Sequence, residues 1–174
     1  MKYEIRQEFN ETAEQVINAM MHPEVAAFLM KHMKSLKEME LLERTETDDT
    51  IVRRVRYRIV PVIEKIGPKK IPPEAFEWVE QSTFDKKKRI MVYKNVPTKH
   101  KIAKLFENFG EIRISYAGAR CVRTMSGELK IHFPLLGSVA EKMIYKKAAE
   151  ILDEEAAALR LFMSPGNFPA GSAR

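Results

Sequence analysis

The sequence predicts an α+β fold in which a curved, seven-stranded antiparallel sheet wraps around one long C-terminal helix. Three observations support this prediction. Residues 137–163 have the spacing of a single amphipathic helix, residues 36–133 divide into strand-length runs separated by turn signals, and two short helical segments follow a first strand. Elements in this order are typical of an α+β arrangement in which the sheet bends around the last helix.

The C-terminal helix is predicted by its boundaries and by its apolar stripe. It starts shortly after Pro134, contains no internal proline or glycine, and ends before Ser164-Pro165-Gly166. Apolar residues recur at helical spacing, at Ala140, Ile144, Ala148, Ile151, Leu152, Leu159 and Phe162. At ~1.5 Å per residue such a helix is roughly 40 Å long. It therefore needs a broad apolar surface, which the strands have to supply.

The first strand and the two short helices are predicted from residues 2–33. Residues 2–9 alternate between charged and apolar side chains, which is the period of a half-buried strand. Thr12 and Gln15 have capping-box spacing at the start of one helix, and Pro23 begins the next. Because both helices are short, we expect them to close one edge of the sheet.

Six further strands complete the predicted sheet. The expected strands are residues 36–46, 50–60, 76–84, 90–93, 105–116 and 119–133. Short connections make most neighbouring strands antiparallel. The connection over residues 61–73 is long, apolar and basic, which is more typical of a functional loop than of a simple hairpin turn.

The length of 174 residues predicts a single domain over residues 1–163, followed by a tail over residues 164–174 that we expect to be disordered. No apolar run approaches the ~20 residues of a membrane span. The first ten residues read as a strand and offer no signal-peptide core, so we expect a cytoplasmic protein. Cys121 is the single cysteine, and we expect a buried, inert thiol.

The charge distribution favours a negatively charged partner. The 30 Lys and Arg residues outnumber the 24 Asp and Glu residues, which gives a net charge of +6. A run of lysines and one arginine lies between Lys86 and Lys104 with no acidic residue among them. Such a basic block suits a lipid headgroup, an acidic protein or a nucleic acid, although a solvated strand face is the ordinary role of any one lysine.

The order of several short motifs resembles a known superfamily. Residues 9–16 (FNETAEQV) followed by residues 22–24 (HPE) are similar to the start of the StAR-related lipid-transfer (START-like, helix-grip) superfamily. Residues 78–85, 94–95 (KN) and 127–129 (GEL) are similar more specifically to PRELI-like lipid-transfer proteins and to uncharacterised bacterial relatives. The resemblance extends to the end of the long helix. It implies a helix-grip fold with a ligand cavity between the sheet and that helix.

Alternating strand direction predicts that three loops share one end of the sheet, namely residues 61–73, 95–101 and 134–138. Apolar tips among lysines suit a peripheral contact with an anionic membrane. The start of the long helix adds partial positive charge there, with Ser138 as the expected cap. The residues expected at this membrane and headgroup rim are Ile66, Lys69, Lys70, Ile71, Lys99, Lys101 and Ser138, with Ile63, Lys65, Val96, Ile102, Leu135 and Leu136 beside them. Ordinary solvated loops are the alternative interpretation.

The inward strand faces carry large or flexible apolar side chains that suit a hydrophobic cavity. The expected ligand-binding residues are Tyr57, Phe76, Trp78, Met91, Tyr93, Tyr116, Arg123, His132, Phe133 and Met143. Further polar residues that could fix the polar end of a ligand are Glu80, Ser82, Arg113 and Arg120. Plain core packing is the alternative role of each residue, and a shift of one residue in register would move every assignment to the other face.

The sequence offers no recognised catalytic or cofactor motif. The four histidines are scattered, no glycine-rich phosphate loop or Walker pattern is present, and neither Cys121 nor any serine lies in a nucleophile motif. We therefore expect a binding protein that uses no cofactor rather than an enzyme.

Three functions remain open. The first is a carrier or sensor that binds a lipid or another large hydrophobic molecule in the cavity, at an anionic membrane surface. The second is a cavity enzyme of the cyclase or aromatase type, as some members of the resembled superfamily are, which requires acid–base groups inside the cavity. The third is a protein-interaction module that uses the basic block. Nucleic acid is a poor partner, because that block lacks a recognition helix and a row of stacking aromatic residues.

Overall fold

The computed structural model describes residues 1–61, 63–118, 120–132 and 135–167. Its elements in chain order are β1 (Lys2–Phe9), α1 (Ala13–Met21), α2 (Val25–His32), β2 (Leu36–Glu46), β3 (Thr50–Ile59), β4 (Lys65–Ile66), β5 (Lys69–Lys70), the 3-10 helix η1 (Pro73–Phe76), β6 (Glu77–Asp85), β7 (Ile90–Pro97), α3 (His100–Ala103), β8 (Phe106–Ala117), β9 (Arg120–Ile131) and α4 (Gly137–Met163).

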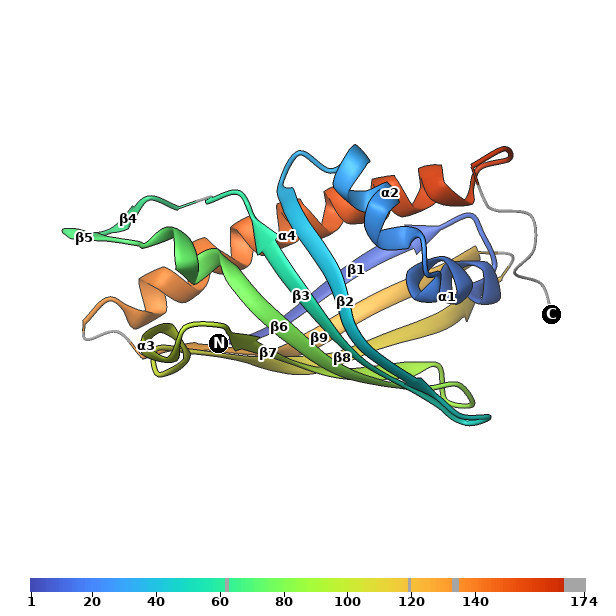
Figure 1. Ribbon diagram of the computed structural model, residues 1–174, viewed down its shortest axis with the longest axis horizontal. Helices are drawn as coiled ribbons and strands as arrows, with labels where there is room; N and C mark the ends of the chain where they lie inside the picture. The colour runs from blue at the N-terminus through green and yellow to red at the C-terminus, as the bar shows by residue number, and fades with distance from the viewer. Residues whose placement is uncertain (62, 119, 133–134, 168–174) are drawn as a thin grey trace.

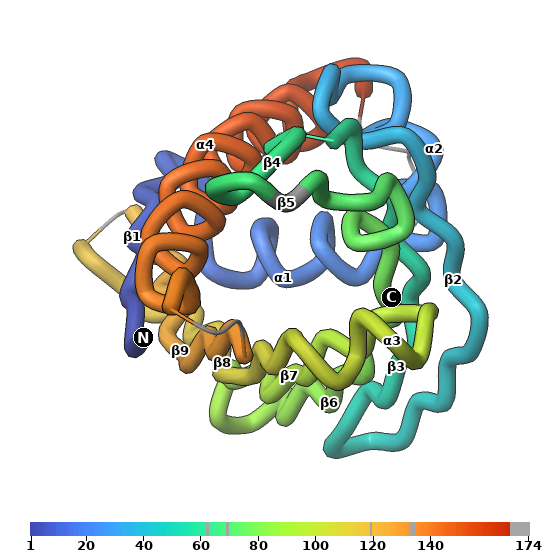
Figure 2. The backbone as a smooth tube through the Cα atoms, turned by 90° about the vertical axis from the view of Figure 1, so that its left-hand side faces the viewer, coloured from blue at the N-terminus to red at the C-terminus, as the bar shows by residue number. Residues whose placement is uncertain are grey.

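The main sheet has seven strands in the order β1-β9-β8-β7-β6-β3-β2, and all of its neighbours are antiparallel. The first strand therefore lies beside the last one. The sheet curves, and α4 runs along its concave side, as Figures 1 and 2 show from two directions. This arrangement confirms the predicted α+β, helix-grip fold.

The long helix α4 begins and ends at the residues that the apolar stripe predicted. It buries Ala140, Ala156, Ala158, Leu159 and Phe162, and its close backbone approaches are mainly to β9, β1, α1 and α2. The two short helices gather over one end of the fold, which we call the helix end (Figure 1). α1 starts with the expected capping box between Thr12 and Gln15.

A small hairpin of β4 and β5 lies at the opposite end, together with α3 and the start of α4 (Figures 1 and 2). We call this the hairpin end. The side chains of Ile63 and Ile66 are buried, the latter to 4% exposure. A Cβ atom on Gly67, at the tip, would lie 2.8 Å from Leu136 Cδ1. The hairpin therefore reaches across the end of the fold and rests on the residue that precedes α4.

A row of cross-strand partners runs through Tyr3, Gly127, Gly110 and Tyr93 on β1, β9, β8 and β7. A Cβ on Gly110 would lie 2.1 Å from the Ser126 carbonyl oxygen, and one on Gly127 would lie 2.4 Å from the Phe109 carbonyl oxygen. Real Cβ atoms do not approach oxygen so closely. The two glycines therefore allow the backbones of β8 and β9 to approach each other closely. We call this row of four residues the creased row, or the crease.

Among the helices that the structure describes, none is both long and apolar enough to cross a membrane.

Candidate functional site

The candidate site is the concave wall formed by β3, β6 and β7. Register places Tyr57 opposite Trp78, and Val55 opposite Glu80 and then Asn95, so these side chains share the inward face with the buried Val55. Tyr57, Trp78, Glu80 and Asn95 nevertheless stay half-buried. α4 approaches β1 and β9 more closely than it approaches this wall.

The apolar part of this wall is aromatic. The rings of Tyr57 and Trp78 are stacked, with centroids 5.6 Å apart and planes inclined by 18°. Phe76, Met91 and Tyr93 are buried beside them in the same core. The structure thus brings together five of the predicted ligand-binding residues on one inward surface.

A buried ion pair lies next to the aromatic residues. Arg53 donates from Nη1 to the Met20 carbonyl oxygen (3.1 Å), and its Nη2 lies 3.5 Å from Met91 Sδ and 3.6 Å from Glu80 Oε1. Burial raises the pKa of the Glu80 carboxyl, and the Arg53 guanidinium offsets part of that effect. Burial, together with the negative charge of Glu80, also raises the pKa of Tyr57 well above its usual value.

Asn95 Oδ1 has no hydrogen-bond partner among the described residues, and Glu80 Oε1 has only the Arg53 guanidinium at 3.6 Å. The buried Ser82 hydroxyl bonds to the Glu80 carboxyl and lowers its pKa. Glu80 and Ser82 are neighbours on the inward face of β6, and Asn95 is the direct cross-strand partner of Glu80 on β7. Buried polar atoms in native proteins are usually paired, so these oxygens require a further partner, which an ordered water or a ligand can supply.

A second polar group links this cluster to β1. Asn95 Nδ2 donates to Asn108 Oδ1 (2.7 Å), and Asn108 Nδ2 donates to the Tyr3 hydroxyl (2.9 Å). The Tyr3 hydroxyl also bonds to the Tyr93 hydroxyl. Burial raises the pKa of Tyr93 far above its usual value, and the adjacent Tyr3 adds to this effect. Tyr93 therefore acts as a neutral hydrogen-bonding group.

Arg123 lies inward, as predicted, but its charge is already matched. It is 1% exposed, donates twice to Gln7 Oε1 (2.9 and 2.7 Å), and forms an ion pair of 2.9 Å with Glu155 of α4. Gln7 in turn donates to Asp153 (3.1 Å). That Arg123 holds a ligand stays a prediction, and the contacts that the structure shows for it are all within the chain. Its side chain joins β9 and β1 to α4.

Three other predicted cavity residues lie at the surface. Tyr116 is 54% exposed at the end of β8, where its hydroxyl bonds to Glu14. His132 lies an odd number of residues from Arg123, so it faces outward, where it contacts Glu107 (3.0 Å). Met143 is 39% exposed, because it lies on the side of α4 away from its buried stripe. Phe133 lies outside the described residues.

The three loops of the predicted rim lie at one end of the fold, but several of their residues are placed differently than expected. The β4–β5 hairpin, α3 and the start of α4 do share one end (Figure 1). Ile66 is buried rather than exposed, because the hairpin folds back over the core, and Ile71 is half-buried. Ser138 does not cap α4, since the cap position is Leu136 without a side-chain hydrogen bond. Lys70, Lys99 and Lys101 are exposed as expected, and the Lys69 side chain lies outside the described residues.

An exposed apolar stripe at the start of α4 was only partly predicted. Leu135, Val139 and Met143 follow one another at four-residue spacing and are all exposed, Leu135 completely. Exposed Leu105 lies near them, because its carbonyl oxygen accepts a hydrogen bond from the backbone of His132, just before this turn. We call these four residues the α4-start patch. Leu135 also has a positive φ of 64°, which is strained for leucine.

The basic block divides between the two ends of the fold. Lys86, Lys87 and Lys88 lie in the β6–β7 turn at the helix end, where they pair with Glu46, Asp49 and Asp85. Lys99, Lys101 and Lys104 lie around α3 at the hairpin end. The block therefore does not form one basic surface, contrary to what its position in the sequence indicates.

Sequence reasoning missed Arg53, Tyr3, Asn95 and Asn108 as members of the inward polar cluster. A signal for Arg53 was available, because it lies two residues before Val55 and therefore faces the same side of β3. The two predicted inward residues Glu80 and Ser82 are correctly placed, whereas Arg113, as a neighbour of buried Ile112 and Ile114, faces outward.

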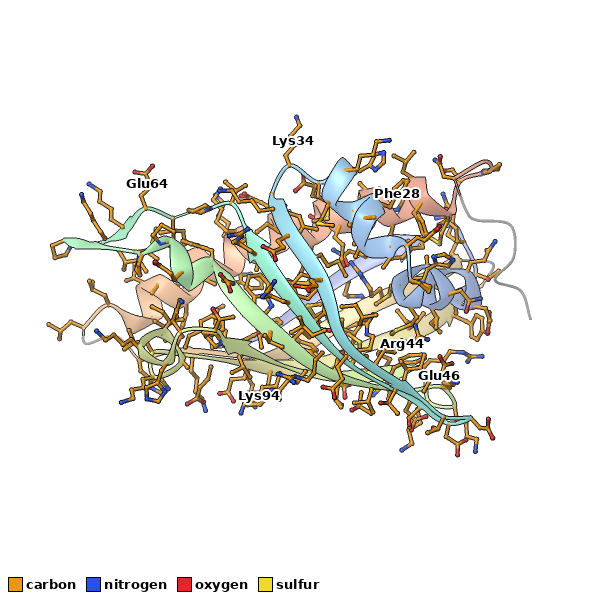
Figure 3. The ribbon with its side chains drawn as sticks, viewed as in Figure 1. Phe28, Lys34, Arg44, Glu46, Glu64 and Lys94 are labelled. Atoms are coloured by element: carbon orange, nitrogen blue, oxygen red, sulfur yellow. The ribbon has the colours of Figure 1, made fainter. Side chains whose placement is uncertain are left out.

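Two open depressions of about 500 and 610 Å³ lie on the outer face of the sheet. The larger depression is lined by the whole creased row and the smaller one by Tyr93 alone of that row. Outward residues such as Val52, Val92 and Phe109 border them. Lys94, at one side, points away from α4 in Figure 3. Arg53 and Ser82 line the smaller depression, whereas Glu80 and Asn95 of the concave wall line neither. Within the described ranges, no group of histidine, cysteine and acidic residues could hold a metal ion.

Several solved structures share this fold. TTHA0849 from Thermus thermophilus has 15% sequence identity and a TM-score of 0.67, and the match covers 94% of this chain and 97% of that chain. The Zhui aromatase/cyclase from Streptomyces sp. R1128 has 15% identity and a TM-score of 0.61, with coverage of 94% and 93%. Norcoclaurine synthase from Thalictrum flavum, in complex with dopamine and hydroxybenzaldehyde, has 14% identity and a TM-score of 0.64, with coverage of 92% and 86%.

At these identities the likeness shows the helix-grip fold alone. No curated protein matches the sequence. A family profile matches residues 4–162, which is most of the chain, and the protein therefore belongs to the family described as "Protein of unknown function (DUF2505)".

Proposed function

We propose that the protein binds a lipid or another large hydrophobic molecule between the concave wall and α4, and that it carries or senses this molecule. The observation that carries the proposal is the concave wall itself, where Tyr57, Trp78, Glu80 and Asn95 point inward and yet stay half-buried. An aromatic surface beside a few unpaired polar atoms is the usual chemistry of a small-molecule site. The START-like and PRELI-like resemblance of the sequence favours a lipid.

The hairpin end supplies an entrance in this proposal. The β4–β5 hairpin rests on Leu136 through Gly67, and its residue Ile66 is buried against the core, so lifting it would expose Ile66 and leave the strands of the main sheet paired. Lifting it would open the concave side next to Trp78 and Tyr57, which lie on the row nearest to that end. The hairpin would then act as a lid over the bound molecule.

The α4-start patch provides a way to meet a membrane. Its four apolar side chains lie at the same end as the exposed Lys70, Lys99, Lys101 and Lys104. Apolar side chains that insert among lipids and cations that contact anionic headgroups are the two components of peripheral membrane binding. We propose a cytoplasmic protein that loads or releases its ligand at such a surface.

Lipid extraction combined with native mass spectrometry tests the binding half of the proposal. We expect the purified protein to carry a copurifying hydrophobic molecule that denaturation releases. A protein that stays free of ligand after exposure to total lipid extract would contradict the proposal.

Sedimentation with anionic vesicles tests the membrane half. Replacing Lys70, Lys99 and Lys101 with glutamate is expected to abolish binding without unfolding the protein. The same reversal of Lys31, Lys34 and Lys37, exposed around the connection from α2 to β2, serves as a matched control, and Lys34 projects into solvent in Figure 3. Equal binding by both variants would remove the membrane half.

A cavity enzyme is the second candidate, favoured by Glu80. A buried carboxyl with a raised pKa beside Arg53 is a possible general acid or base. The named functions of two structural neighbours, an aromatase/cyclase and norcoclaurine synthase, are consistent with it. Incubation of the copurified molecule with the wild type and with Glu80→Gln decides between the two: a chemical change that depends on Glu80 favours the enzyme, and an unchanged molecule favours the carrier.

A further inference from the structure

We infer that the molecule bound at the concave wall has a neutral polar end made of hydroxyl groups, which Glu80, Ser82 and Asn95 recognise. This inference rests on the proposed function and specifies the class of ligand. It excludes a phosphate or carboxylate at this position, and it excludes a cationic amine.

The three recognising groups lie close together. Glu80 and Asn95 are direct cross-strand partners on β6 and β7, which places their Cβ atoms about 4.5–5.5 Å apart. Ser82 follows Glu80 on the same face of β6, about 7 Å along the strand. A single small headgroup with two or three hydroxyl groups can therefore reach all three side chains.

The atoms that lack partners are all oxygens. Asn95 Oδ1 has no donor among the described residues, and Glu80 Oε1 has only the Arg53 guanidinium at 3.6 Å, whereas the Asn95 amide nitrogen already donates to Asn108. The Ser82 hydroxyl bonds to the Glu80 carboxyl and can still accept a hydrogen bond. Oxygens without donors favour a ligand that brings donors. A hydroxyl group both donates and accepts, so it satisfies Glu80 in its ionised form and in its protonated form.

The nearest charges argue against an ionic headgroup. Arg53 is the cation of this wall, and it already donates to the Met20 carbonyl and lies 3.6 Å from Glu80. An anionic headgroup would be placed against the Glu80 carboxylate, and an ammonium group would be placed against the Arg53 guanidinium. A neutral headgroup meets neither repulsion.

The apolar body of the ligand would lie on the row next to this cluster. Tyr57 and Trp78 form the next inward-facing pair, two residues nearer to the hairpin end than Val55 and Glu80. Their stacked rings offer a flat apolar surface between the polar cluster and the lid. The ligand would thus enter with its hydroxyl groups first, and its apolar part would extend toward the hairpin end.

Trp78 provides the readout, because it is the only tryptophan in the chain. Three probes with the same twelve-carbon chain are titrated below their micelle concentrations: glycerol monolaurate, dodecyl phosphate and dodecyltrimethylammonium. We expect glycerol monolaurate to change Trp78 fluorescence at a concentration at least about tenfold lower than either ionic probe requires. Each unmatched charged contact lowers the binding affinity by about this factor or more.

Ser82→Ala tests the recognising group directly. Ser82→Ala removes one hydrogen bond, to the neighbouring Glu80 carboxyl, so we expect the variant to fold with a Tm lowered by about 2–4 °C. We expect it to bind glycerol monolaurate about five- to tenfold more weakly, with no change for dodecyl phosphate. Thr83→Ala, on the outward face of the same strand, is the matched control and should bind all three probes as the wild type does.

The outcomes separate the inference from the proposed function. Equal or tighter binding of an ionic probe, or binding of glycerol monolaurate that does not respond to Ser82→Ala, overturns the hydroxyl inference and leaves a hydrophobic site in place. No Trp78 response to any probe overturns the proposed function, and the inference with it.

Discussion

The hydroxyl groups of Tyr3 and Tyr93 meet on the concave side although two strands separate β1 from β7. The residues between them in the same row are Gly127 and Gly110. Because neither glycine has a side chain, the Tyr3 ring can lie across β9 and β8. A Cβ on Gly127 would be 2.8 Å from the Tyr3 hydroxyl. The tyrosine contact therefore depends on glycine for space.

Gly127→Ala is the first prediction. The added Cβ would lie 2.4 Å from a backbone oxygen and would displace the Tyr3 ring, so we expect a loss of about 1–3 kcal/mol in the free energy of unfolding. Urea denaturation measures this loss. Ser126→Ala, on the outward face of the same strand, should change stability by less than about 0.5 kcal/mol. Equal stability of the two variants would show that the backbone around Gly127 shifts to accommodate the added Cβ without loss of stability.

The fold was predictable because its signals are local. The stripe of α4, the alternation of β1 and the capping box of Thr12 each follow from nearby residues, and all three are correct. The β4–β5 hairpin was missed, because a two-residue strand leaves no period to detect. Burial of Ile66 depends on where the hairpin folds back, and local sequence does not encode that.

The candidate site was less predictable, because it depends on register and on distant pairing. Arg123 and His132 were both expected to face inward, although residues an odd number apart in one regular strand face opposite sides. That error could have been avoided. The role of Arg123 could not have been found from the sequence, because both of its partners are distant along the chain. Gln7 precedes Arg123 by more than one hundred residues, and Glu155 lies on a different element after it.

Arg123→Met is the second prediction. The variant leaves Glu155 without its cation and Gln7 without its donor, and breaking a buried pair typically costs about 3–5 kcal/mol. We expect a loss of stability of that size in chemical denaturation. Lys130→Met interrupts an exposed pair of 3.6 Å with Glu128 and should cost no more than about 1 kcal/mol. Similar losses in the two variants would refute the view that Arg123 is a central tie between sheet and helix.

Glu80 leads to a prediction about pH. Burial raises its pKa in the folded state above the value of 4.5 for a free side chain, so the folded protein binds the proton more tightly than the unfolded chain does. Its contribution to stability is therefore fully present below about pH 4.5 and is lost as the pH rises through the raised pKa. Glu80→Gln removes this dependence, so the stability of the variant relative to the wild type should increase from about pH 4.5 toward neutrality.

Unfolding free energies of the wild type and Glu80→Gln across this pH range and below it provide the measurement. Glu46 supplies a control of opposite sign. Hydrogen bonds from Lys86 and Arg44 lower its pKa, so its contribution is present above about pH 4.5 and is lost as the pH falls. Glu46→Gln should therefore lose stability relative to the wild type as the pH rises toward about 4.5. Parallel profiles for the two variants would argue against a raised pKa at Glu80.

Leu135→Gly separates stability from membrane binding at the α4-start patch. Leu135 is fully exposed at a positive φ, a conformation that costs a non-glycine residue about 1–2 kcal/mol. Glycine adopts it without strain, so we expect an equal or higher Tm. Because an inserted leucine side chain contributes about 1.5–3 kcal/mol, binding to anionic vesicles should fall by about tenfold or more. Val92→Thr, exposed on the outer face of β7, should bind vesicles normally, and undiminished binding by Leu135→Gly would exclude this patch from the membrane contact.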